Sequence, residues 1–276
     1  MKKYIYPQLS LNRSQDLGFF RIGGPGLANC LFVAARSYLR AKDLQCEMLR
    51  PTWERLSIGQ WLRGERDKRF YYGLFKNDSL WKTIRKVLAI KFNKHIEVEE
   101  GLGNFFEDII SRQREVLDWF FASIEKKSIQ AVPADLHDYI AVHVRLGDFP
   151  LKMRTPISWY RSIVERLSAR FRKKVLIFSD GSDSELSGLL ELRDVRRAFY
   201  GNALADMVAI SRCSVLIAGK YSTFSSWGAY LGNVPSIFQE IDYGRVVPSG
   251  LELRLGQSTD IPDSFLKCLE ARFNEA

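Results

Sequence analysis

One stretch of the chain, residues 139–149, constrains the fold more than any other. It begins as a short apolar run rich in β-branched side chains, which is typical of a buried parallel strand. It then changes abruptly to His143, Arg145, Gly147 and Asp148. In an open α/β sheet, ligands bind at the carboxyl ends of strands, so polar chemistry is expected at this point. The stretch therefore predicts a buried strand with a ligand site at its end.

The side chains at the end of that strand suit a diphosphate. The guanidinium of Arg145 is planar, always charged and able to make paired hydrogen bonds to phosphate oxygens. Gly147 lets the backbone turn tightly or approach a ligand closely. From this stretch alone, a purely structural interpretation is as well supported as ligand binding. In the structural interpretation, His143 is a core residue, Arg145 belongs to a surface ion pair and Gly147 to an ordinary loop.

Two further regions carry motifs. Residues 23–36 read Gly-Gly-Pro-Gly-Leu-Ala-Asn-Cys-Leu-Phe-Val-Ala-Ala-Arg, a glycine turn that leads into apolar side chains at helical spacing. Residues 206–213 follow the pattern Asp-x-x-x-x-Ser-x-Cys, and residues 222–230 read Ser-Thr-Phe-Ser-Ser-Trp-Gly-Ala-Tyr. Together with His-x-Arg-x-Gly-Asp at 143–148, and in the same order, they resemble motifs of the α1,2-fucosyltransferases and the related α1,6- and protein O-fucosyltransferases.

The resemblance implies an α/β protein of GT-B-like fold, in which two Rossmann-like halves face each other across a cleft. Residues 1–134 are then the acceptor-side half, and residues 135–276 the half that binds GDP. The implied reaction is inverting transfer of fucose from GDP-fucose to a glycan hydroxyl, in α1,2 linkage, for a surface polysaccharide such as an O-antigen or capsule. Transfer of another nucleotide sugar, and a non-catalytic carbohydrate- or anion-binding protein of the same fold, stay open as alternatives.

By resemblance, side chains of the second half bind the donor, and each has a structural interpretation as well. His143 and Asp206 contact guanine or ribose, whereas taken alone they suggest a core histidine and a solvated or capping carboxylate. Arg145 is the catalytic cation. Asp148 orients Arg145 or braces the loop, with a direct catalytic role as the alternative. A helix start bearing hydroxyls binds phosphate and also caps itself. The expected donor-binding residues are His143, Arg145, Asp206, Ser222, Thr223, Ser225 and Ser226.

The glycine-rich loop has both a functional and a structural interpretation. By resemblance, Gly24, Gly26 and Asn29 lie near the sugar or the acceptor. By itself, the loop is a tight turn that lets a strand and a helix pack closely. The chain also departs from its relatives. Leu146 stands where they commonly carry a second arginine, Phe149 where they carry tyrosine, and the glycine spacing is displaced.

The general base that an inverting transfer requires is not identified by any motif. The α1,6 relatives use a glutamate shortly beyond the signature, whereas here that region reads Lys-Met-Arg-Thr at 152–155. Asp148, Asp180, a residue of the first half and the departing phosphate are the candidates. No carboxylate pair forms a convincing metal cage either. We therefore expect no metal and no cofactor beyond the GDP-fucose donor, with Arg145 and a helix start stabilising the leaving group.

Composition narrows the class of protein. The formal charge is +9, but the basic residues are scattered among acidic ones and no nucleic-acid module accompanies them, so nucleic acid is not the expected partner. Peripheral association with an anionic inner membrane leaflet is more plausible, although the sequence pattern identifies no amphipathic anchor. The four cysteines form no C-x-x-C pair and are expected to be reduced. Without an apolar span or a signal-peptide core, we expect a cytoplasmic protein.

The remaining pattern suggests where the elements lie. Residues 105–124 carry one apolar helical face, and residues 126–134 read as the connection between halves. The second half alternates strands and helices, with strands expected at 175–180, 198–200, 215–218 and 236–238 and a helix capped by Ser158. The aromatic residues of the stretch 48–99 suggest either an acceptor platform or ordinary core and rim positions; they are Trp53, Trp61, Tyr71, Tyr72, Phe75 and Trp81.

Overall fold

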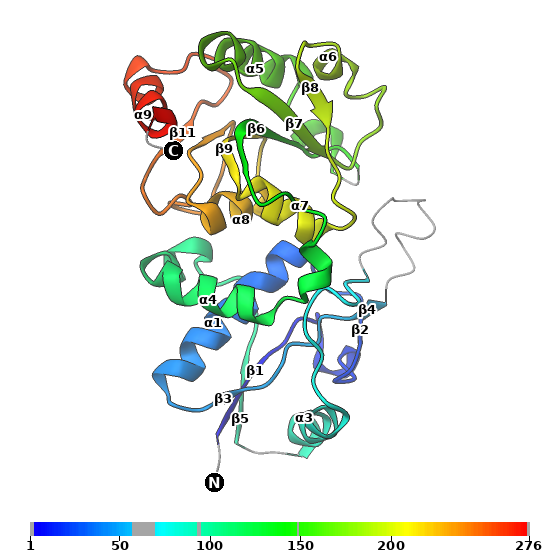
Figure 1. Cartoon of the computed structure of the whole chain (residues 1–276). Helices are drawn as coiled ribbons and strands as arrows, with labels where there is room; N and C mark the ends of the chain where they lie inside the picture. The colour runs from blue at the N-terminus through cyan, green and yellow to red at the C-terminus, as the bar shows by residue number, and fades with distance from the viewer. Residues whose placement is uncertain (1–2, 57–69, 93–94, 148, 275–276) are drawn as a thin grey trace. The chain divides into compact units, whose positions relative to one another are not determined.

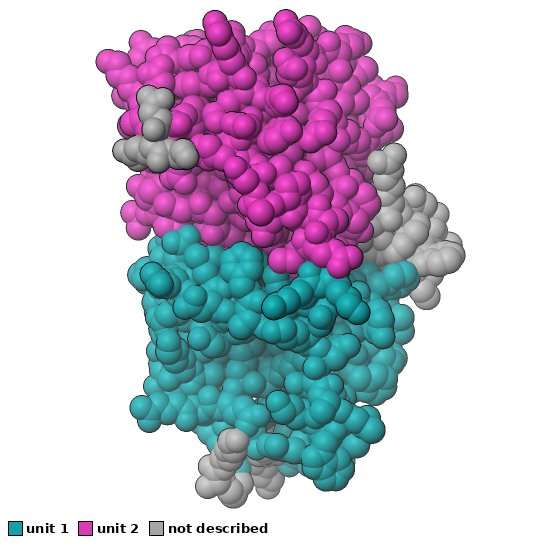
Figure 2. Space-filling model, in the orientation of Figure 1, with its two compact units in different colours: residues 1–128 teal, residues 129–276 magenta. Residues whose placement is uncertain are grey.

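The computed structural model describes residues 3–56, 70–92, 95–147 and 149–274 (Figure 1). The chain forms two compact units, Met1–Ser128 and Ile129–Ala276, which are coloured separately in Figure 2. The division falls inside the stretch 126–134, slightly before the predicted boundary between residues 134 and 135. Each unit is an α/β structure with a parallel sheet, so the predicted α/β class is confirmed.

Unit 1 is built around a small parallel sheet of order β3-β1-β5. A second, two-stranded parallel sheet joins β2 to β4. The strands are β1 (Tyr4–Pro7), β2 (Arg21–Ile22), β3 (Glu47–Met48), β4 (Arg55–Leu56) and β5 (Ile96–Glu99). The α-helices are α1 (Leu27–Asp43), α3 (Leu80–Phe92) and α4 (Gln113–Ser123), and short 3₁₀ turns are η1 (Arg13–Gln15), η2 (Phe105–Asp108), η3 (Ile110–Arg112) and η4 (Lys126–Ile129).

The helix expected over 105–124 is shorter than predicted. Of its predicted apolar face, Ile109, Val116, Phe120 and Ile124 are buried, whereas Phe105 is only half-buried and its neighbour Phe106 is buried instead. The first part, however, forms the 3₁₀ turns η2 and η3, and α4 begins only at Gln113. The carboxylate of Asp108 accepts hydrogen bonds from the backbone and side-chain nitrogens of Asn104 (2.9 and 3.1 Å). Such local side-chain bonds compete with regular helix geometry.

Unit 2 contains one six-stranded sheet, of order β11-β10-β9-β6-β7-β8, in which every pairing is parallel. The strands are β6 (Leu136–Val144), β7 (Lys174–Ser179), β8 (Val195–Arg197), β9 (Cys213–Ala218), β10 (Ser236–Phe238) and β11 (Glu252–Arg254). The helices are α5 (Ile157–Phe171), α6 (Ser187–Leu190), α7 (Ala203–Ile210), α8 (Thr223–Gly232) and α9 (Asp263–Asn274), with a 3₁₀ turn η5 (Leu151–Met153).

The strand order of unit 2 is that of a Rossmann fold. Numbered along the chain from β6, it reads 3-2-1-4-5-6. The chain builds outward from β6 through β7 to β8, returns to the other side of β6 with β9, and continues outward to β11. The direction therefore reverses between β6 and β9, where His143 is in register with Ala218. Loops diverge at the carboxyl ends of two such strands and leave a crevice for a ligand.

Most elements of unit 2 lie where the periodicity predicts them, with two corrections. The strand expected at 198–200 is instead β8, at Val195–Arg197. The cap of α5 is Pro156 rather than Ser158, which lies inside the helix and accepts a hydrogen bond from the Ser162 hydroxyl (3.0 Å). Proline is tolerated at a helix start because its missing N–H is not needed there.

Candidate functional site

His143 lies near the carboxyl end of β6 and is almost completely buried. Its Nδ1 is 3.3 Å from the Ser222 hydroxyl, and its ring is 5.1 Å from the ring of Phe224. Burial lowers the pKa of His143, the charge of Asp180 opposes that effect and the charge of Arg145 adds to it, and the resulting pKa is about 4. The imidazole is therefore neutral at physiological pH. It is a core histidine, as the structural interpretation holds, and it also joins two motifs that are distant in the sequence.

The hydroxyls at the start of α8 are mostly engaged within the helix. Ser222 is the N-cap, and its side chain accepts a hydrogen bond from the backbone N–H of Ser225 (3.4 Å). The buried hydroxyls of Ser225 and Ser226 donate to the Ser222 carbonyl oxygen (3.2 and 3.0 Å). The capping interpretation is therefore confirmed for Ser222. The half-buried Thr223, the N–H of Phe224 and the positive end of the helix dipole also lie at this helix start.

The loop that follows β6 is braced by Asp180, which follows β7. One carboxylate oxygen of Asp180 accepts hydrogen bonds from the backbone N–H groups of Leu146 (2.7 Å) and Gly147 (3.1 Å). A Cβ on Gly147 would lie 2.6 Å from the other oxygen, so a side chain here would have to displace the Asp180 carboxylate. Bracing of this loop was the role expected of Asp148, which lies outside the described residues.

Arg145 lies directly after β6 and is half-buried. Its guanidinium carbon is 4.7 Å from the centre of the Phe149 ring, a cation–π distance. Its charge also acts on Tyr243, whose pKa burial raises to about 12 while Arg145 opposes that rise. Arg145 therefore brings a positive charge to the carboxyl end of β6, as predicted, and that charge acts on both His143 and Tyr243.

Arg154 is a residue of this site that the sequence did not reveal. Its guanidinium donates to the carbonyl oxygens of Phe149 (3.0 Å) and Gly147 (3.1 Å) and to the Glu185 carboxylate (3.2 Å). It therefore holds the same loop as Asp180, but through backbone carbonyls rather than N–H groups. No motif or spacing signals such a role, because it depends on the backbone path of the loop.

Asp206 lies in the first turn of α7, the helix that connects β8 to β9. One of its oxygens accepts a hydrogen bond from the backbone N–H of Tyr200 (2.8 Å), while Asn202 caps the helix. The helix packs against α8 and β9, and β9 pairs with β6. Asp206 therefore makes a local structural bond on a helix that packs against the strand next to β6.

The glycine-rich loop of unit 1 wraps around a buried arginine. Arg21 is fully buried, and its guanidinium donates to the carbonyl oxygens of Thr52 (3.1 Å), Gly23 and Pro25 (3.4 Å) and to the Cys30 sulfur (3.2 Å). Gly24 has a φ of 90°, and a Cβ there would lie 2.6 Å from the Leu9 carbonyl oxygen. The tight-turn interpretation is thus confirmed for Gly24.

The other two loop residues differ from Gly24. Gly26 is the N-cap of α1 with an ordinary φ of −68°, and Asn29 is half-buried in the first turn. The Leu27 N–H at the start of this helix donates to the Tyr71 hydroxyl (2.9 Å). The loop is therefore held from inside by Arg21 and at the helix start by Tyr71.

The aromatic residues of the stretch 48–99 do not form one platform. Trp53 and Phe75 are buried and stacked, with ring centres 3.8 Å apart, and Tyr71 is buried as well. Tyr72 and Trp81 are exposed, and Trp61 lies outside the described residues. The core interpretation therefore holds for the buried members of the set.

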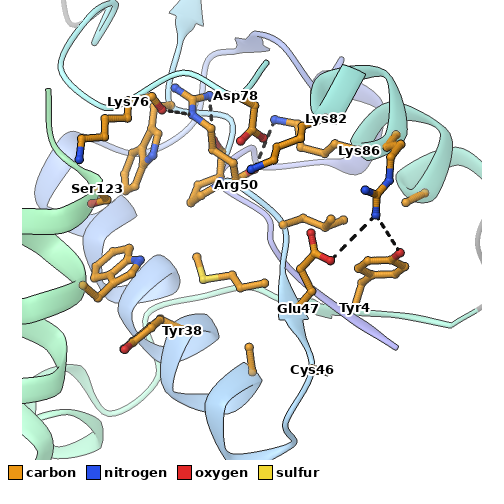
Figure 3. A pocket seen from close by; sticks show the side chains of 18 of the residues that line it. Tyr4, Tyr38, Cys46, Glu47, Arg50, Lys76, Asp78, Lys82, Lys86 and Ser123 are labelled. Carbon is orange, nitrogen blue, oxygen red and sulfur yellow. Dashed lines mark hydrogen bonds and ion pairs between the residues drawn. The ribbon is translucent and has the colours of Figure 1, made fainter. Parts of the chain in front are cut away.

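Unit 1 also contains a pocket of about 600 Å³, alongside the edge strand β3, and no residue of the His143 signature lines it. Figure 3 shows Arg50, Asp78, Lys82 and Lys86 gathered at one side of the pocket, and Tyr38 on the side across from them. The Tyr38 ring stacks with that of Trp119 at 5.8 Å. The lining thus combines aromatic rings with cations, a combination that suits an anionic ring-shaped ligand.

Lys86 is the most buried cation of this pocket, with a side chain 2% exposed. Its ammonium donates to the Arg50 carbonyl oxygen and to the Thr52 hydroxyl, both at 3.3 Å. Burial lowers its pKa to about 8, and the Arg50 charge adds to this, while Asp16, Glu54 and Asp78 oppose it. Among the described residues, no carboxylate forms an ion pair with Lys86. Its ammonium group therefore lines the pocket with only neutral hydrogen-bond partners.

Within the described part of the chain, no group of three or more His, Cys, Asp or Glu side chains is placed to hold a metal ion. The absence of a required metal nevertheless stays a prediction. The cysteines are free thiols, as expected. In the same described ranges, no helix is both long and apolar enough to cross a membrane.

No protein-family model matches the chain, and no curated protein matches it. Among solved structures, the NodZ α1,6-fucosyltransferase of Bradyrhizobium soaked with GDP-fucose is 15% identical, with a TM-score of 0.45 over 85% of this chain and 94% of that one. Arabidopsis thaliana FUT1 mutant R284K in complex with GDP is 12% identical, with a TM-score of 0.46 over 90% and 73%.

The E. coli heptosyltransferase WaaC with ADP-2-deoxy-2-fluoro heptose is a third similar structure. It is 11% identical, with a TM-score of 0.48 over 99% of this chain and all 100% of that one. At these identities and TM-scores, the likenesses assign neither a family nor a substrate to the chain.

Proposed function

We propose that the chain is a glycosyltransferase that moves fucose from GDP-fucose to a glycan hydroxyl with inversion, in α1,2 linkage, in the assembly of a surface polysaccharide. One observation carries the proposal. The His143 signature and the Ser222 motif, 79 residues apart, meet through the His143–Ser222 contact at the switch point of a Rossmann-type sheet. The fucose, the linkage and the pathway come from the sequence resemblance.

The leaving diphosphate defines what the site must do. Negative charge grows on the phosphate as the glycosidic bond breaks, and preorganised positive groups stabilise it. Arg145 supplies a full charge at the end of β6, and the start of α8 supplies backbone N–H groups and a dipole. A preorganised donor of this kind lowers the barrier by roughly 3–4 kcal/mol. No metal is then needed for charge stabilisation.

The neutral state of His143 suits a base or a ribose hydroxyl better than a phosphate. An uncharged imidazole donates one hydrogen bond and accepts one; because Nδ1 contacts the Ser222 hydroxyl, Nε2 is the atom left for a base or a ribose hydroxyl. The carboxylate of Asp206 can accept from N1–H and the exocyclic amine of guanine, a pair that adenine does not present.

The hydrogen bonds of Asp180 remove it from the candidates for the general base. One of its oxygens is engaged by two backbone N–H groups, and its loss would release the signature loop. It therefore acts as a positioning residue. We assign the proton to Asp148, to a residue of the first half or to the departing phosphate.

A second candidate function is a carbohydrate- or anion-binding protein without turnover. The pocket of unit 1 favours it, because aromatic rings and Lys86 there provide a ligand site in which the signature takes no part. Release of GDP from GDP-fucose separates the two functions, since a binding protein holds its ligand intact.

Calorimetric titration with GDP, GDP-fucose, GDP-mannose, UDP and ADP, in the presence of EDTA, tests the proposal. We expect guanine-selective binding that is lost in Arg145→Ala. Arg161→Ala is the matched control, because that arginine forms an exposed i,i+4 ion pair with Glu165 on α5. Selective binding of another nucleotide would make the fucosyl assignment wrong. Absence of any nucleotide binding would favour the second candidate function.

A further inference from the structure

The outward face of α3 is apolar. Leu80, Ile84, Leu88 and Phe92 follow one another at intervals of four residues, and their exposed fractions are 77%, 38%, 52% and 76%. Trp81, beside Leu80, is 72% exposed. Residues four apart lie on the same side of a helix, so these five side chains form one stripe. We call Leu80, Trp81, Ile84, Leu88 and Phe92 the α3 stripe.

The opposite face of α3 packs against the rest of unit 1, so the orientation of the helix that exposes the stripe is fixed by these contacts. Ile90 packs with Tyr6 and Leu49 in a small core cluster beside the β3-β1-β5 sheet. The buried Lys86 donates to the Arg50 carbonyl oxygen on the same side. A surface helix of a soluble protein places its apolar residues inward and its lysines outward. Here a lysine lies inside while five large apolar side chains face out.

The charged residues of α3 are all of one sign. The helix contains Lys82, Arg85, Lys86 and Lys91 and no aspartate or glutamate. Lys82, Arg85 and Lys91 are exposed; among the described residues, Arg85 forms an ion pair with Glu47 at 4.0 Å, and Asp78 lines the same pocket as Lys82. Cationic residues that flank an apolar stripe complement a surface that is negative outside and apolar beneath, which is the surface of an anionic bilayer.

We propose that α3 is an interfacial anchor that lies flat in the surface of a membrane containing anionic phospholipid, with the α3 stripe inserted among the acyl chains. A helix of 13 residues is about 20 Å long, which is too short to cross the apolar core but suits this orientation. Trp81 prefers the boundary between headgroups and acyl chains, and Lys91 can extend its ammonium to the headgroups.

A protein partner fits the stripe less well. Protein interfaces are depleted in lysine, whereas lysines and an arginine border this stripe and no acidic residue of the helix balances them. A neighbouring loop adds a second apolar contact. Gly18 packs against Val87 of α3, where a Cβ would lie 2.6 Å from a Val87 methyl group, and the next residue, Phe19, is 54% exposed. In this proposal, α3 is the amphipathic anchor that the sequence pattern did not identify.

Flotation of the full chain with lipid vesicles tests the anchor. We expect the protein to float with vesicles of phosphatidylcholine and phosphatidylglycerol, much less with phosphatidylcholine alone, and less as salt rises. Leu88→Glu places a charge in the stripe and should weaken partitioning at least about tenfold. The matched control is Tyr72→Glu, at a residue of unit 1 that is 78% exposed but lies outside α3.

Trp81 provides a direct readout of insertion. Phosphatidylcholine with brominated acyl chains, mixed with phosphatidylglycerol, should quench its fluorescence, and Trp81→Phe should abolish that quenching. Equal urea midpoints of Leu88→Glu and the wild type would show that the helix still folds. Flotation of Leu88→Glu like the wild type would overturn the proposal. So would a dimer, seen by light scattering without lipid, that Leu88→Glu dissociates.

Discussion

The glycine-rich loop of unit 1 and the signature loop of unit 2 both follow a strand, but opposite charges hold them. A cation, Arg21, holds the first through backbone carbonyls, whereas an anion, Asp180, holds the second through backbone N–H groups. The signature loop has therefore committed the N–H groups of Leu146 and Gly147 to its brace. In the proposed function, the positive groups that face the phosphate are therefore the Arg145 side chain and the start of α8. In the glycine-rich loop, the carbonyls point at Arg21.

The largest expected effect is a loss of stability when Arg21, which holds the glycine-rich loop of unit 1, is replaced. Arg21→Met should lower the free energy of unfolding by about 3–5 kcal/mol, because several buried carbonyl oxygens lose their donors. Urea denaturation measures this loss. Arg40→Met is the matched control, since that arginine is exposed and pairs with Glu97 at the surface, so we expect a change within about 0.5 kcal/mol. Equal midpoints for both variants would mean that Arg21 does not hold the loop.

The second effect is a response of unit 2 to mild acid. The pKa of His143 is about 4 in the folded protein and near 6.5 when unfolded. The folded state therefore disfavours protonation, and stability is fully present above pH 6.5 and lost as pH falls towards 4. The loss is on the order of 3 kcal/mol at pH 4.

His143→Gln isolates that response, since glutamine does not titrate. Urea midpoints measured from pH 7 to 4 should fall less steeply in this variant than in the wild type. Parallel pH profiles for the two proteins would contradict a buried neutral imidazole.

The third effect concerns the brace of unit 2. Asp180→Ala should lower stability by about 2 kcal/mol, because two loop N–H groups lose their acceptor, and should weaken GDP binding by displacing Arg145. Asp180→Asn keeps one acceptor oxygen and should therefore recover part of the stability and part of the GDP affinity. If GDP affinity survives in Asp180→Ala while stability falls, the brace is structural and does not position the cation.

The smallest expected effect is on stability and tests the contact between Gly147 and Asp180. Gly147→Ala should lower stability by about 1 kcal/mol, because the new methyl group would press on the carboxylate. In an Asp180→Ala background the same change should have almost no effect, and a double-mutant cycle measures the coupling. Additive effects of the two substitutions would show that the contact is not what requires glycine.

The sequence predicted the elements far better than the contacts that hold the site. Apolar runs located β6, β7, β9 and β10, because buried parallel strands are hydrophobic on both faces. The roles of Arg21, Asp180 and Arg154 could not be predicted, since each depends on backbone groups brought close only by the fold. The α3 stripe differs, because its four-residue spacing is visible in the sequence. What periodicity cannot tell is which face of a helix turns outward.

An apolar stripe on a helix also determines where a protein searches for its substrate. A protein held in a membrane surface diffuses in two dimensions rather than three, so it meets surface-bound molecules often and dissolved ones rarely. The side chains of Leu80, Trp81, Ile84, Leu88 and Phe92 would then bias the choice of substrate by location, before any residue near His143 makes a contact.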